Sequence, residues 1–169
     1  TTYTNSTSFS AGTGVTTSDL AISASGTITD INVELNISGS QTYHISGKDI
    51  KLISPYGTVV DLAVSSSFSG TVSLSQTVLD DEATTTINSG SSPYFGSFQP
   101  DGNLSDFDGQ SMTGTWQLWL YEESHTATVS SWKLIITSDS STPSDPPTTS
   151  GTTYTNSTSF SAGTGVTTS

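Results

Sequence analysis

Apolar and polar residues alternate along much of the first 137 residues of this chain. In Ile28–Ile37 (ITDINVELNI), every second side chain from Ile31 onward is aliphatic, and the side chains between them are acidic or amide groups. A period of two is typical of a half-buried β-strand. Similar short apolar runs are Asp49–Ser54, Thr58–Val64, Thr71–Val78, Thr115–Tyr121 and Val129–Thr137.

Turn residues separate these runs, as in Pro55–Gly57 and Ser69–Gly70. No segment has a convincing helical period. Many short strands punctuated by Gly and Pro predict an all-β fold, an antiparallel β-sandwich or jelly roll.

The chain also repeats itself. Residues 1–18 (TTYTNSTSFSAGTGVTTS) recur without change as residues 152–169. Such identity indicates one complete unit followed by the start of a second. We therefore predict a domain over residues 1–137, a linker over 138–151 that is rich in Pro, Ser and Thr, and the first strand region of the next repeat over 152–169. Three prolines stiffen the linker.

Charge limits the possible partners. The chain has 15 acidic residues, three lysines, no arginine and no cysteine, for a net charge of -12. Nucleic-acid binding is disfavoured because it needs a basic surface.

We expect no membrane insertion, because no apolar run has the length of a membrane span. Without cysteine there is neither a disulfide nor a thiolate metal site. The abundance of Ser, Thr, Gly, Asn and Asp is common in secreted β-proteins and favours an extracellular location.

Several motifs in order resemble one family. They are GKDIKLISPYGTVVDL (47–62), VLDDEA (78–83), FGSFQPDGNLSDFDGQSMTGTWQLWL (95–120) and VSSWKLIIT (129–137). Together they resemble the P domain, or Homo B domain, which follows the catalytic domain of proprotein convertases and of many bacterial secreted proteases. The resemblance covers about residues 1–137. It implies a galactose-binding-like β-sandwich jelly roll of about eight strands, often with bound calcium and without catalysis of its own. It also implies core positions for Trp116 and Trp132.

The acidic residues suggest a metal site. Asp80, Asp81 and Glu82 are consecutive, so their charges repel one another unless a cation is near. In an extended segment, Asp80 and Glu82 would point one way and Asp81 the other. Carboxylate oxygens suit Ca²⁺. The candidate calcium ligands are Asp49, Asp80, Asp81 and Glu82, then Asp30 and Asp106, with Asp101 and Asp108 as further candidates.

Catalytic motifs are missing. The chain has no HExxH and no GxSxG, and its two histidines, His44 and His125, are interpreted as loop residues. We therefore expect no enzymatic activity. Trp119 lies on the opposite strand face from Trp116. A second kind of site is therefore a glycan-binding surface formed by Trp119 together with Tyr121.

Three functions follow from these features. The first is a calcium-stabilised structural module of a secreted or cell-surface array or fibre, whose partners are neighbouring copies of the same repeat. The second is an accessory P domain that stabilises or targets a secreted subtilisin-like protease or metalloprotease in the same polypeptide. The third is a glycan-binding module.

Overall fold

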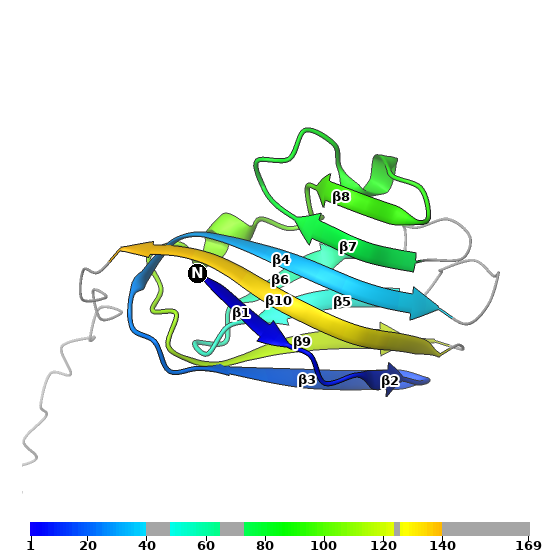
Figure 1. Ribbon diagram of the computed structural model, residues 1–169, viewed down its shortest axis with the longest axis horizontal. Helices are drawn as coiled ribbons and strands as arrows, with labels where there is room; N and C mark the ends of the chain where they lie inside the picture. The colour runs from blue at the N-terminus through cyan, green and yellow to red at the C-terminus, as the bar shows by residue number, and fades with distance from the viewer. Residues whose placement is uncertain (40–47, 65–72, 124–125, 140–169) are drawn as a thin grey trace, which may run out of the picture.

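Two β-sheets pack face to face in this chain (Figure 1). The computed structural model describes residues 1–39, 48–64, 73–123 and 126–139. Within these ranges the only helical segments are two short 3₁₀ turns, η2 (Ile87–Ser89) and η3 (Leu104–Phe107). The predicted all-β sandwich is therefore confirmed.

The larger sheet has six strands, in the order β1-β10-β4-β7-β8, with β2 also paired to β10. Its long central strands are β4 and β10, which pair antiparallel along almost their whole length. The strands of this sheet are β1 (Thr2–Asn5), β2 (Phe9–Ala11), β4 (Thr27–Gly39), β7 (Ser73–Leu79), β8 (Tyr94–Phe98) and β10 (Ala127–Asp139).

The smaller sheet has four strands in the order β3-β9-β5-β6, all antiparallel. They are β3 (Gly14–Ile22), β5 (Lys48–Ile53), β6 (Val59–Ala63) and β9 (Gly114–Glu122). Residues 1–22 thus lie at one edge of the sandwich, because β1 and β2 border one sheet and β3 borders the other (Figure 1).

One strand pair departs from the antiparallel prediction. Strands β7 and β8 run parallel, with Leu74 opposite Tyr94 and Leu79 opposite Phe98. Parallel neighbours need a crossover of a dozen or more residues. Residues 80–93 supply that crossover here and include η2. The sequence prediction contained no strand at β8.

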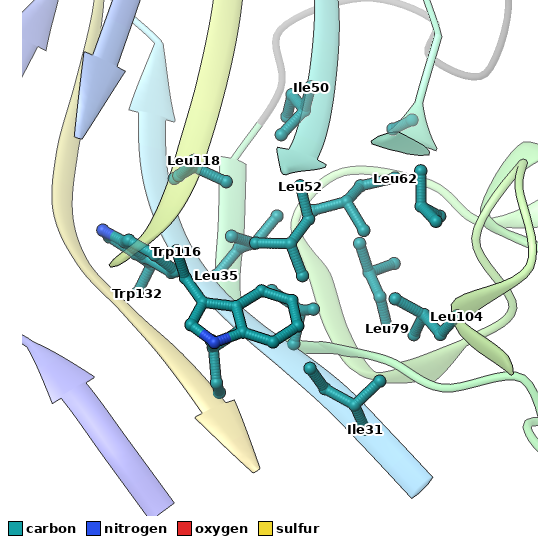
Figure 2. Close-up of a cluster of buried hydrophobic side chains, with 14 of the residues drawn as sticks. Ile31, Leu35, Ile50, Leu52, Leu62, Leu79, Leu104, Trp116, Leu118 and Trp132 are labelled. Atoms are coloured by element: carbon teal, nitrogen blue, oxygen red, sulfur yellow. The ribbon is translucent and has the colours of Figure 1, made fainter. Parts of the chain in front are cut away.

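The core lies between the two sheets (Figure 2). The predicted inward face of β4 is confirmed, since Ile31, Val33 and Leu35 are at most 1% exposed. Trp116 and Trp132 are completely buried, as the family resemblance implied. The Trp116 indole N–H donates to the Met112 carbonyl oxygen at 3.0 Å, and its ring meets Phe107 edge to face. The buried indole therefore keeps its hydrogen bond.

The other predicted strands are found at β5, β6, β7, β9 and β10 with small shifts of their ends. The predicted turn at Pro55–Gly57 is confirmed by the hydrogen bond from Gly57 N to Ser54 O at 2.9 Å. Gly57 has a φ of 84°, which favours glycine. The predicted turn at Ser69–Gly70, both histidines, the linker beyond Asp139 and residues 152–169 lie outside the described residues.

Candidate functional site

The acidic residues Asp80, Asp81 and Glu82 form a turn directly after β7. Backbone hydrogen bonds hold the turn, from Asp80 N to Phe98 O at 3.0 Å and from Ala83 N to Asp80 O at 3.1 Å. The side chain of Asp80 also accepts a bond from Glu82 N at 2.9 Å. An Asp side chain that accepts the N–H two residues later is a common way to fix a turn.

Asp81 caps η3. Its Oδ1 accepts Leu104 N at 3.0 Å, and its Oδ2 accepts Ser105 N at 2.9 Å. The residue at the local N-cap position, Asn103, makes no side-chain cap hydrogen bond. Asp81 satisfies these N–H groups from a distant part of the chain, and the 3₁₀ turn places Leu104 in the core. This role is structural.

Asp80 and Glu82 lie side by side, which affects the ionisation of Glu82. A side-chain hydrogen bond with Asp80 raises the pKa of Glu82 above its ordinary value of 4.5, and the nearby charge of Asp30 adds to the effect. Burial, followed by the charges of Asp30 and Asp81, raises the pKa of Asp108. Like charges disfavour the ionised form of a carboxyl group. Asp30 of β4, the turn after β7 and Asp108 after η3 thus form one acidic surface.

This acidic surface has the donor chemistry that Ca²⁺ prefers. Among the residues that the structure describes, however, no three acidic or histidine side chains converge as a group that could hold a metal ion. A calcium ion there would need further oxygen ligands from backbone carbonyls and water, and weak affinity is then expected. The calcium prediction remains a prediction.

Two other predicted ligands lie on β5 and η3. Asp49 is in β5 of the four-stranded sheet, opposite Tyr121 of β9. Asp106 is exposed on η3, where its carbonyl oxygen accepts the Gln110 side chain at 2.9 Å. The sequence places three carboxylates in a row, and the structure puts them in a turn and not in the extended segment considered above. The closeness of Asp30 and Asp108 depends on how β4 and η3 pack.

Asp101 has a structural role near the same end of the sandwich. Its carboxylate accepts Asn88 Nδ2 at 2.6 Å and Val64 N at 2.8 Å, which joins the end of β6 to η2. A shallow polar pocket of about 200 Å³ separates this group from Asp81, lined also by Gln99, Pro100, Gly102 and Asn103. The pocket is polar and open, unlike a typical small-molecule site.

The outer face of the four-stranded sheet carries the aromatic pair considered for glycan binding. Trp119 and Tyr121 project from the same face of β9, their ring centroids 6.3 Å apart and their planes at 17°. Both are half-buried. Lys51 lies 5.6 Å from the Trp119 ring centroid and pairs with Asp61 of β6. The exposed side chain of Val15 lies on β3, opposite Tyr121. Trp116 faces inward, so the predicted division between the two tryptophans is confirmed.

The sequence of this β-sandwich matches a known family of domains. Residues 28–136 match the family model of the proprotein convertase P-domain. The chain belongs to this family, as its motifs suggested. The P domain is a non-catalytic accessory domain of proteases, in agreement with the lack of catalytic motifs.

Two solved structures are similar to this chain. They are a serine protease of Aeromonas sobria, with 14% identity and a TM-score of 0.44, and the same protease in complex with its chaperone, with 15% identity and a TM-score of 0.43. Each alignment covers 82% of this chain but 27% of the protease chain, so this chain spans about a quarter of those proteases. No curated protein matches the sequence. In the described ranges, no helix is long and apolar enough to cross a membrane.

Proposed function

We propose that this chain is a non-catalytic accessory domain of a secreted protease. The observation that carries the proposal is the match of residues 28–136 to the P-domain family, whose members accompany protease catalytic domains. In this role the domain stabilises or targets a catalytic domain in the same polypeptide. Its location is then extracellular, reached through the secretory pathway.

The mass and the peptide map of the native polypeptide test this proposal. The polypeptide would be isolated from its source with an antibody against residues 1–139, fully denatured, weighed and mapped by peptide mass spectrometry. We expect a catalytic region of roughly 30–60 kDa, the size of one or two domains, joined to one or two copies of this unit. A polypeptide made only of many copies would overturn the proposal.

A second candidate is a structural repeat module in an extracellular array or fibre, with neighbouring copies of the unit as partners. One observation favours it, the unchanged recurrence of residues 1–18 as 152–169. An identical copy in the same chain suggests tandem units. The same mass measurement separates the two functions, because an array gives a mass of many repeats without a catalytic domain.

We also propose that the acidic surface at Asp30, Asp80 and Glu82 takes Ca²⁺ in either context. The support is the closeness of these carboxyl groups. A side-chain hydrogen bond with Asp80 is the largest cause that raises the pKa of Glu82, and the charges of Asp30 and Asp80 add to it. A bound cation would reduce this like-charge repulsion. The ion would stabilise the turn that connects β7 to its parallel partner β8. Calcium has no catalytic part in this proposal.

Glycan binding on the outer face of the four-stranded sheet is the third candidate. The aligned rings of Trp119 and Tyr121 favour it, because amphipathic aromatic rings are common in binding surfaces. Lys51, however, already lies against Trp119.

A further inference from the structure

Strands β1 and β2 lie next to β10 at one edge of the six-stranded sheet. The chain carries two identical segments whose sequence matches this edge position. Residues 1–18 provide β1, β2 and the first part of β3. Residues 152–169 have the same sequence. Each side chain that holds the first segment in place therefore has a counterpart in the second.

The contacts of the first segment are specific. In β1, Tyr3 pairs with Leu134 and Asn5 with Trp132, and in β2, Ala11 pairs with Ala127. Ala11 is 0% exposed, and Tyr3 packs partly buried against the core. Asn5 Nδ2 donates to Asp19 O at 2.8 Å, while Asn5 Oδ1 accepts Thr7 N at 2.9 Å. These contacts fix one register of β1 and β2 along the side of β10 that does not pair with β4.

The second segment carries the same set of side chains. Tyr154, Asn156, Phe160 and Ala162 correspond to Tyr3, Asn5, Phe9 and Ala11. The correspondence includes both strands that border β10. It runs from Thr1 and Thr152 to Ser18 and Ser169, which includes all of β1 and β2.

The chain direction and length permit this replacement within one molecule. Strand β1 runs antiparallel to β10, so a chain that leaves β10 and turns back enters the β1 position in the correct direction. Thr152 would take the place of Thr1, which is hydrogen-bonded to Ile136. That place is roughly 11 Å from Asp139, whereas residues 140–151 can span roughly 40 Å.

Glycine gives the backbone conformational freedom at the joint between β2 and β3. Gly12 follows β2, and Gly14, with a φ of 98°, is the first residue of β3. A Cβ atom at either glycine would meet no atom within 4 Å, so the joint lies in open space. Rotation there would release β1 and β2 as a pair.

We propose that residues 152–162 are a second, intramolecular occupant of the edge site on β10, able to take the place of residues 1–11 in the same chain. The first segment holds the site in the intact chain, because it continues directly into β3. When it is displaced or damaged, the second segment docks in the same register. The released first segment is then free to enter an equivalent edge site on a neighbouring unit.

Four versions of the 169-residue chain test this exchange: the unchanged chain, Ala11→Asp, Ala162→Asp and the double variant. A carboxylate at the completely buried Ala11 position disfavours docking of the segment that carries it. Hydrogen exchange with mass spectrometry follows both segments, and melting and gel filtration follow the whole chain. The two single variants are matched, because they place the same charge in identical sequences.

We expect Ala162→Asp to behave like the unchanged chain. In Ala11→Asp, residues 152–162 gain amide protection, residues 1–11 lose it, and Tm stays within a few degrees. The double variant loses protection in both segments and melts about 10 °C lower. All four chains remain monomers, and the Tm of Ala11→Asp does not depend on protein concentration.

Two results would overturn the proposal. In the first, residues 152–162 stay unprotected in Ala11→Asp, which shows that the second segment does not use the site. In the second, Ala11→Asp forms dimers or melts higher at higher concentration, which shows that the segment docks on another molecule instead.

Discussion

Asp81 accepts the backbone N–H of Leu104, 23 residues further along the chain, at 3.0 Å. Its second oxygen accepts the next N–H, that of Ser105. One carboxylate thus joins the turn after β7 to η3, whose Leu104 and Phe107 are buried in the core. Asp81 therefore stabilises the packing of a segment that has no side-chain cap of its own.

Replacement of this cap should destabilise the domain. We expect Asp81→Ala to lower the free energy of unfolding by about 1–3 kcal/mol, because two N–H groups at η3 lose their acceptor. Asp81→Asn, which keeps one acceptor oxygen, should cost less. Urea denaturation measures both. The matched control is Asp106→Ala on the exposed side of η3. An equal loss in the control would contradict the capping role.

Acidification should stabilise the domain when divalent ions are removed. The pKa of Glu82 is higher in the folded chain than its ordinary value of 4.5. The folded state then binds this proton more tightly, so the stability it gives is present at low pH and lost as pH rises through the raised pKa. In EDTA, Tm should rise as pH falls from 7 toward the ordinary Glu pKa of 4.5. Glu82→Gln should show a smaller rise. The same slope in both chains would exclude Glu82 as its source.

Calcium should raise the stability through the same surface. At about ten times Kd, one bound ion adds about 1.4 kcal/mol to the free energy of unfolding. Melting curves with calcium and with EDTA measure this effect. Asp80→Asn should reduce the gain, while Asp49→Asn should keep it, because Asp49 lies in the other sheet. The site assignment is wrong if the two variants respond alike. The calcium proposal fails if roughly 10 mM of the ion changes nothing.

The two tryptophans of β9 should differ in their contribution to folding. Trp116→Ala removes a completely buried ring and should cost about 3–5 kcal/mol. Trp119→Ala removes a half-buried ring that lies near Lys51 and should cost about 1 kcal/mol. Chemical denaturation of the two variants measures both losses in the free energy of unfolding. Similar losses would show that the outer face is as important for folding as the core.

Trp119→Ala also tests the outer face as a glycan site. If the aromatic pair binds carbohydrate, a glycan array should give signals that disappear in this variant and in Tyr121→Ala. Val59→Ala is a suitable control, because Val59 is exposed on β6 of the same sheet and lies outside the aromatic pair. Binding that persists in both aromatic variants would exclude this version of the glycan hypothesis.

The sequence by itself determined most of the strands and their buried faces. Alternation is a local property, so the inward positions of Ile31, Val33 and Leu35 could be predicted from Ile28–Ile37 alone. The ordered motifs determined the family and the burial of Trp116 and Trp132. The identity of residues 1–18 and 152–169 is likewise a property of the sequence.

Only the tertiary structure decided which distant residues meet. The parallel pairing of β7 with β8 depends on the path of residues 80–93, which no alternation pattern encodes. Asp81 was predicted as a metal ligand, and its capping of η3 depends on the position of a segment 23 residues away. Asp30 lies near Glu82 because β4 and β7 are neighbours. A local pattern determines which side chains of a strand face the core. Strand pairing and packing determine which distant residues contact the ends of that strand.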